Sequence, residues 1–156
     1  MISVDDYLYY VDAALDGMTE IVTGLGDELA NRRPDLPGAN SPYAILTHCL
    51  GVMEYWGGEI VAGREIVRDR EAEFVATGSV AELAGRVEAA RRRFAADIDG
   101  ADMAAPPRGK PRADLRDTPL GRTAGGALQH MYRELAQHHG HMELTRDVLR
   151  ERIAGG

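Results

Sequence analysis

The sequence has little cysteine, few aromatic residues and no long apolar run. One cysteine in 156 residues excludes a disulfide scaffold and any CxxC metal or redox motif. No apolar run approaches the roughly 18 residues of a membrane span, so we expect none. The net charge of −7 argues against nucleic acid as a partner, because phosphate binding needs a basic surface. The N-terminus is acidic where a secretory signal is basic, so we expect a cytoplasmic protein.

The composition is that of one soluble globular domain. Of the residues, 44% are hydrophobic and 28% are charged. A chain of this length buries enough surface for a core without disulfides or structural metal. We find no internal repeat and expect a single domain over residues 1–156. The basic residues are arginines apart from Lys110, a bias that is typical of a GC-rich genome.

Apolar residues recur at helical spacing in four segments, and no segment alternates like a strand. We expect long helices near residues 4–30, 42–62, 79–98 and 122–153, and a short helix within 68–76. Ser41 and Pro42 are typical of a helix start, and Gly63 of a helix end. The pattern therefore predicts an all-α four-helix bundle. Its weakest point is the Gly125-Gly126 pair near the start of the last helix.

Ionisable side chains gather on one face of the last predicted helix. At about 100° per residue, His130, Glu134, His138 and His141 fall within an arc of about 80°, which they share with apolar residues such as Ala127. We therefore expect them to point into the bundle. Burying such groups is unfavourable unless they are paired or bound to a metal. His139 falls on the opposite side, where we expect it to be exposed.

The spacing of Glu134 and His138 suits a metal ion. They lie four residues apart, one turn along the same face, as in zinc sites with two ligands on one helix. His48 is predicted to face inward from the second helix and is the candidate third ligand. Three protein ligands leave a coordination position open, as in catalytic sites. The alternatives are a hydrogen-bonded core histidine at position 48 and a hydrogen-bonded Glu134–His138 pair without metal.

A long loop without periodicity separates the third and fourth predicted helices. Residues 99–121 contain four prolines, which exclude a long helix. Between Pro106 and Arg116 the loop carries a local charge of +3, from Arg108, Lys110, Arg112 and Arg116 against Asp114. We expect this loop to lie over the open end of the site, or else to be simply solvated. Trp56 is expected in the core or the pocket wall, and Cys49 as a small buried apolar residue.

The chain resembles the DinB/YfiT-like superfamily of four-helix bundles over essentially its whole length. The resemblance rests on Arg32-Arg33-Pro34, Ser41-Pro42-Tyr43-Ala44-Ile45-Leu46-Thr47-His48, Glu54-Tyr55-Trp56 and Glu134-x-x-x-His138-x-Gly140-His141. It is similar above all to the actinobacterial branch that includes mycothiol-dependent maleylpyruvate isomerase with its metal-binding domain. The superfamily's usual pattern in the last helix is HxxxHxGQ. In this chain Glu134 stands in place of the first histidine of the pattern, and His141 stands in place of the glutamine.

The resemblance implies that His48, Glu134 and His138 bind a divalent metal, with zinc the expected ion. It further implies a thiol S-transferase or thiol-dependent isomerase that uses mycothiol or a similar low-molecular-weight thiol with a small electrophile. His141 or His130 would act as acid or base or would orient a metal ligand, and Trp56 would wall the pocket. Any of three loop residues could meet an anionic substrate: Arg108, Lys110 and Arg112.

Two other classes of function stay open. An open metal site can activate water for hydrolysis. A bundle of this kind can also bind metal or a small ligand without catalysis, because fold alone does not determine function. The sequence also leaves a homodimer open.

Overall fold

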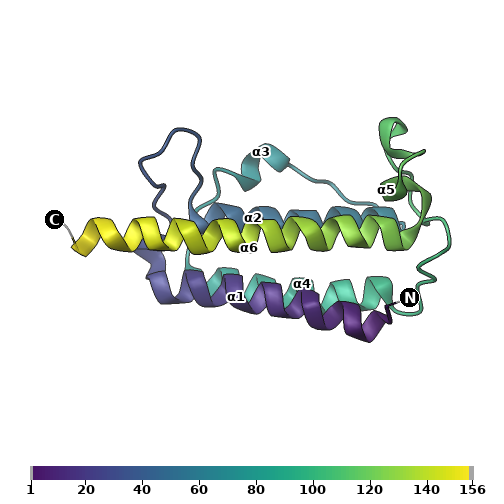
Figure 1. Cartoon of the computed structure of the whole chain (residues 1–156), viewed down its shortest axis with the longest axis horizontal. Helices are drawn as coiled ribbons and strands as arrows, with labels where there is room; N and C mark the ends of the chain where they lie inside the picture. Colours follow the sequence, from purple (N-terminus) through teal and green to yellow (C-terminus); the bar gives the residue numbers. More distant parts are fainter. Residues whose placement is uncertain (1, 155–156) are drawn as a thin grey trace.

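The chain folds into an all-α bundle with two layers of long helices (Figure 1). This computed structural model describes residues 2–154, and side chains up to residue 151. Helix α2 lies beside α6 in one layer, and α1 lies beside α4 in the other. The long helices are α1 (Val4–Ala30), α2 (Pro42–Met53), α4 (Val80–Ile98) and α6 (Ala124–Ala154). No helix within the described residues is long and apolar enough to cross a membrane.

Side-chain caps fix where three of these helices begin. Ser3 and Ser41 accept hydrogen bonds from the backbone N–H groups of Asp6 and Ala44, as N-cap residues do. Ser79 precedes α4, but its hydroxyl makes no capping bond. Instead, the Asp27 carboxylate of α1 accepts from the N–H of Val80 at 2.8 Å. The start of α4 is therefore held by α1.

The second predicted helix changes its winding halfway. Helix α2 ends at Met53, and a π-helix, η1 (Glu54–Val61), continues it. The N–H of Ala62 reaches back five residues to the carbonyl of Gly57. Gly63 has a φ of 75° and ends the segment, as expected of a glycine at this position in the sequence. The prediction of one helix over 42–62 is thus right in extent and wrong in winding.

The last helix begins two residues later than predicted. Residues 113–122 form a 3-10 turn, η2 (Ala113–Leu115), and a single helical turn, α5 (Pro119–Arg122). Helix α6 starts at Ala124 and runs through both glycines without a break. Loop carbonyls satisfy its first N–H groups, since Ala124 donates to Ala105 and Gly125 donates to Met103.

The core lies between the two layers and is filled by aliphatic side chains. The largest fully buried side chains are Leu15, Met18, Ile45, Leu46, Met53, Ile60, Leu83, Ile98, Leu128, Met131, Leu135 and Met142. Helix α2 is buried on nearly all sides. A helix that is apolar all round needs cover on its outer face as well, and the connection between η1 and α4 supplies it.

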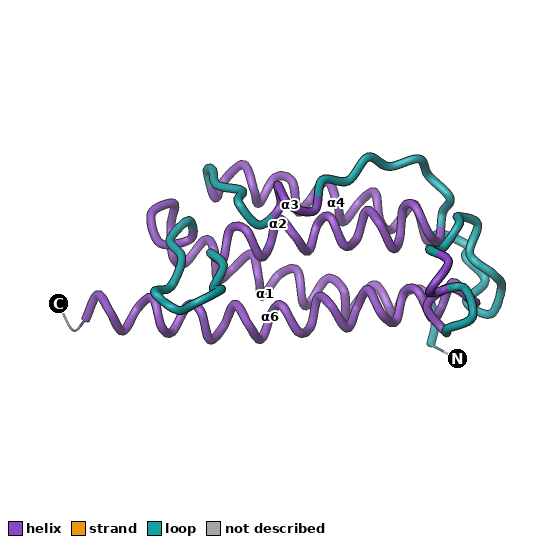
Figure 2. The backbone as a smooth tube through the Cα atoms, turned by 90° about the horizontal axis from the view of Figure 1, so that it is seen from above, coloured by secondary structure: helices purple, strands orange, loops and turns teal. Residues whose placement is uncertain are grey.

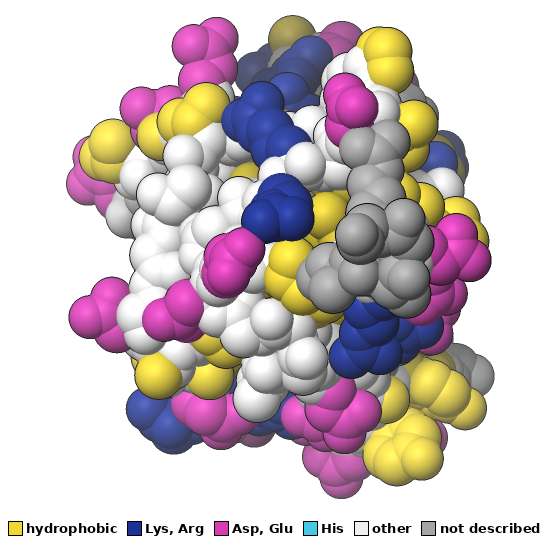
Figure 3. All heavy atoms as spheres, turned by 90° about the vertical axis from the view of Figure 1, so that its left-hand side faces the viewer, with side chains coloured by type: hydrophobic (Ala, Val, Ile, Leu, Met, Phe, Trp, Pro, Cys, Tyr) yellow, Lys and Arg dark blue, Asp and Glu magenta, His cyan; other side chains and the backbone are white. Residues whose placement is uncertain are grey.

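This connection, residues 62–79, runs back along the bundle from the end of η1 (Figure 2). It contains the short helix α3 (Arg70–Glu73), which packs against α2 and falls within the predicted 68–76 segment. Figure 3 views the bundle from the end at which α6 finishes, where acidic and basic side chains mix and no described histidine reaches the surface in view. The histidines lie further along the helices.

Candidate metal site

His48 is held from three sides on the buried face of α2. The residue is about 3% exposed, and its Nδ1 atom lies within hydrogen-bond distance of Oε2 of Glu73, at 2.8 Å. The Phe74 ring stacks on the imidazole with centroids 4.4 Å apart. The ring of His138, which belongs to the facing helix α6, meets the imidazole edge-on, with the two ring centroids 5.0 Å apart. The ring is therefore fixed in position, with its Nε2 edge away from Glu73.

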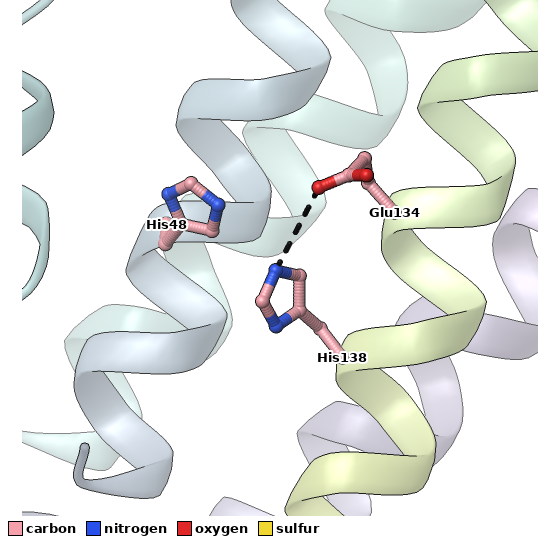
Figure 4. A group of neighbouring side chains, drawn as sticks. All are labelled: His48, Glu134 and His138. Carbon is pink, nitrogen blue, oxygen red and sulfur yellow. Dashed lines mark ion pairs between the residues drawn. The ribbon is translucent and has the colours of Figure 1, made fainter. Parts of the chain in front are cut away.

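Glu134 and His138 face His48 from α6 (Figure 4). Because they are four residues apart, they lie one turn from each other on the helix surface. Nε2 of His138 lies 3.9 Å from Oε2 of Glu134. One ligand atom from each of His48, Glu134 and His138 lies within 4.8 Å of the others. The structure thus brings together the three residues that the sequence singled out.

The donor set fits a divalent metal ion. Two imidazole nitrogens and a carboxylate oxygen are ligands that zinc accepts, about 2.0–2.2 Å from the ion. Ligand atoms at that distance from one ion lie roughly 3–3.5 Å from each other. The three ligand atoms here lie up to 4.8 Å apart, which is somewhat wider. A shift of about 1 Å or less in each atom closes the difference. No fourth residue within the described chain joins this group, so the set offers three protein ligands.

Burial keeps the imidazoles in the form that binds metal. It lowers the pKa of His48, His138 and His130 below the ordinary value of 6.5. For His48 the contact with Glu73 opposes this effect without reversing it, and for His138 the nearby His48 adds to it. At neutral pH the rings are therefore uncharged, and neutral imidazole is the ligating species.

An open pocket of about 470 Å³ adjoins two of the three residues, His48 and Glu134. His48 and Glu134 line it at the metal end, together with residues from α2, η1, the 62–79 connection, the loop before α6 and α6 itself. These other lining residues are Val52, Tyr55, Trp56, Glu59, Ile66, Arg68, Arg70, Arg112, Leu115 and His130. The pocket is large enough for a small molecule beside a metal-bound ligand.

His130 and Trp56 form one wall of this pocket. Trp56 is almost fully buried, and its ring packs edge-on against His130. Nε2 of His130 lies 3.9 Å from Oε1 of Glu134, whereas His138 lies nearest to the other carboxylate oxygen, Oε2. His130 is thus a partly buried imidazole beside the cluster, with its ring facing the pocket.

The loop before α6 reaches the pocket through one of its basic residues. Arg112 lines the pocket and forms a two-point ion pair with Asp114. Arg108 and Lys110 are exposed and lie outside the pocket lining. The loop is anchored to η1, because the N–H of Gly109 donates to the carbonyl of Ile60 at 2.9 Å. The expected placement beside the site therefore holds for the Arg112 part of the loop.

Two histidines of α6 do not lie as predicted. His141 is exposed, with its ring centroid 6.4 Å from that of His138, so the expectation that it points into the core is wrong. The buried face of α6 is centred on Met131, Leu135 and Met142, and the ionisable residues lie along its edge. His139 is half-buried against Gly17 of α1 rather than freely exposed.

No sequence pattern indicated which residues hold His48. Arg68, Glu73 and Phe74 come from a segment that is charged and only weakly periodic. Glu73 is about 8% exposed, and Arg68 donates to both of its oxygens at 2.6 and 2.8 Å. The one local signal is Asp69, which caps α3 by accepting from the N–H of Ala72. That signal predicts a helix start but not what the helix packs against.

Comparison with known proteins places this arrangement in a family. The family model described as Mycothiol-S-transferase matches residues 7–155, which include the whole candidate site. No curated protein matches the chain.

Proposed function

Because the chain belongs to the mycothiol-S-transferase family, we propose that it is a metal-dependent enzyme that transfers a low-molecular-weight thiol, mycothiol or a close analogue, to a small electrophile. The observation that supports this most is the convergence of His48, Glu134 and His138, of which His48 and Glu134 line an open pocket. Two of these side chains come from α6 and one from α2. Buried or half-buried ionisable groups on facing helices need a partner that satisfies all of them.

The sulfur that reacts comes from a small molecule rather than from the chain. Cys49 is the only cysteine, it is fully buried, and burial raises the pKa of its thiol far above the ordinary value. A buried thiol of this kind is not a nucleophile. A divalent metal bound by the three ligands would instead supply the acidity that deprotonates a coordinating thiol.

The residues around the cluster then have distinct tasks. Glu134 and His138 of α6 and His48 of α2 would hold the metal ion from facing helices. His130 lies beside Glu134 in the pocket wall, where an imidazole can take up or return the proton of the thiol or of the electrophile. His141, which is exposed and outside the pocket lining, is less suited to that task.

The pocket favours an electrophile that carries negative charge. Three guanidinium groups line it, those of Arg68, Arg70 and Arg112. The pair between Arg68 and Glu73 is largely buried, whereas the pair between Arg112 and Asp114 is exposed to solvent and therefore weak. Arg70 packs over the Phe74 ring, 5.3 Å from its centroid. Because arginine recognises carboxylates through paired hydrogen bonds, Arg112 and Arg70 are the residues we expect to contact an anionic substrate.

A panel assay tests this proposal. The purified protein is supplied with Zn²⁺ and a generic alkylating electrophile, and loss of free thiol is followed for mycothiol, glutathione and cysteine. We expect consumption of mycothiol that a chelator stops and that His138→Ala lacks. Hydrolysis of the electrophile without loss of thiol would instead indicate metal-activated water. Metal binding with neither reaction would indicate a non-catalytic bundle.

A further inference from the structure

We propose that Glu73, clamped by Arg68, is a positioning residue that presents Nε2 of His48 to Glu134 and His138. This inference rests on the proposed metal-dependent function for its purpose, although the contacts that carry it are independent of any ion. The Glu73 carboxylate comes from the 62–79 connection, outside the four long helices of the bundle.

Both carboxylate oxygens of Glu73 are engaged by Arg68 or His48. Its Oε1 accepts from Nε of Arg68 at 2.6 Å, and its Oε2 accepts from Nη2 of Arg68 at 2.8 Å and from Nδ1 of His48 at 2.8 Å. An ionised carboxylate only accepts hydrogen bonds. Nη2 of Arg68 also lies 3.5 Å from Nδ1, but the contact with the Glu73 oxygen is much shorter at 2.8 Å. This shorter contact favours the proton of the neutral imidazole on Nδ1, which leaves the lone pair on Nε2. Histidine ligands in metal sites are commonly oriented by such a carboxylate.

The bond to Glu73 disfavours the flipped orientation of the ring. Phe74 stacks on one face of His48 with an interplanar angle of 27°, and His138 meets the ring at 79°. Turning the ring over would lose the bond to Glu73 and leave a buried carboxylate oxygen with one donor fewer. Because Arg68 engages both oxygens, Glu73 is an orienting group here rather than a fourth ligand.

A glycine in α2 leaves the space that this arrangement requires. A Cβ atom at position 51 would overlap Oε1 of Glu73 and lie 3.1 Å from Nε of Arg68. Glycine is unfavourable inside a helix relative to alanine, and Gly51 lies one turn from His48 on α2. The helix thus keeps a destabilising residue at the place where the carboxylate passes.

Gly51→Ala separates positioning from folding. The added methyl group meets only the ends of flexible side chains, so the carboxylate is displaced while the helix itself is favoured. Gly85→Ala on α4 is the matched control, because a Cβ there meets nothing within 4 Å. Glu73→Ala removes the carboxylate, and Glu73→Gln keeps an oxygen that can accept from Nδ1.

Two measurements on the full chain test the proposal. The first is the tautomer of His48 in the metal-free protein, read from the ¹⁵N shifts of the ring. The second is the affinity for Co²⁺, measured by competition with a coloured chelator. We expect the Nδ1–H tautomer in the wild type and a mixture in Glu73→Ala. We expect Co²⁺ to bind about 10–100-fold more weakly in Glu73→Ala and Gly51→Ala, and Glu73→Gln to recover part of the loss.

The outcomes distinguish this inference from the proposed function. Unchanged tautomer and Co²⁺ affinity in both Glu73→Ala and Gly51→Ala, relative to Gly85→Ala, would overturn the positioning role. If Glu73→Ala does not fold, Gly51→Ala decides. A wild type that binds no Co²⁺ would contradict the metal-dependent function instead, and the tautomer measurement would still show whether Glu73 orients His48.

Discussion

The ring of Trp56 packs edge-on against the ring of His130, with centroids 4.7 Å apart and planes 70° apart. Trp56 belongs to η1 and His130 to α6, so this contact ties the π-helix to the helix that carries Glu134 and His138. It also keeps His130 at the pocket wall within 3.9 Å of Glu134. Among the histidines outside the metal cluster, His130 is the one placed to exchange protons with a bound substrate.

Replacing His130 by Gln should therefore slow the chemical step and leave the metal in place. Burial lowers the pKa of His130, so its neutral form is present at neutral pH and can accept a proton. General acid–base groups contribute on the order of 100-fold or more to rate. We expect kcat for mycothiol transfer to fall by about 100-fold with Zn²⁺ content unchanged. Equal kcat in the two proteins would remove His130 from the mechanism.

Arg112→Ala should weaken the binding of an anionic electrophile selectively. Loss of one charged hydrogen bond corresponds to about a tenfold change in affinity. We expect KM for chloroacetate to rise about tenfold, while KM for chloroacetamide, which is similar in size and uncharged, stays the same. Arg116→Ala is the control, because Arg116 is exposed in the same loop and does not line the pocket. Parallel changes for both electrophiles would show that Arg112 shapes the loop instead.

Arg64→Ala should destabilise the fold without direct contact to the site. Arg64 joins Glu54 of η1 to Asp97 of α4 through bonds of 2.7–2.9 Å, all partly exposed to solvent. We expect the free energy of unfolding at neutral pH to fall by about 1–2 kcal/mol. Chemical denaturation measures this loss. A change within error would show that solvent screens these pairs fully.

The same network gives a pH dependence of stability. Burial raises the pKa of Glu54, but the hydrogen bonds from Arg64 and Arg93 outweigh it, and the pKa is lowered from 4.5. The contribution to stability is therefore complete above pH 4.5. It is lost as the pH falls from there through the lowered pKa of the folded state. Arg64→Ala should reduce this acid sensitivity, and an identical pH profile in the variant would contradict the assignment.

Cys49 should not react with thiol reagents in the folded protein. Its side chain is fully buried and its pKa is raised by that burial, so neither access nor thiolate is available. We expect no colour with an aromatic disulfide reagent at pH 8, and one equivalent per chain in denaturant. Fast reaction of the native protein would reopen the question of whether the sulfur nucleophile belongs to the chain.

The parts of the fold that were predictable are those encoded by local pattern. The apolar spacing and the Ser41-Pro42 start fix α2, and the four-residue spacing of Glu134 and His138 puts both on one face of α6. The start of α4 depends partly on Asp27, from another helix, and no local signal can show that. The π-helix has the same apolar pattern as an α-helix, so its winding was not predictable from that pattern.

The site was predictable in its ligand residues and not in its support. A helical wheel gives the direction of His138 but not where the buried face of α6 ends, which is why His141 was misplaced. Glu73 contacts His48 only because the 62–79 connection folds back over α2. That contact joins residues 25 positions apart through a segment with little periodicity. Tertiary packing alone brings it about.

The rate of mycothiol transfer as a function of added Zn²⁺, starting from metal-free protein, tests the central claim most directly. The account predicts a rate that rises linearly to one equivalent per chain and is then constant. At one equivalent of Zn²⁺ per chain it predicts no mycothiol transfer by His48→Ala or His138→Ala. It predicts the wild-type rate of transfer for His139→Ala, which changes a histidine outside the cluster. Full activity of the metal-free protein, or undiminished activity of His48→Ala and His138→Ala, would contradict it.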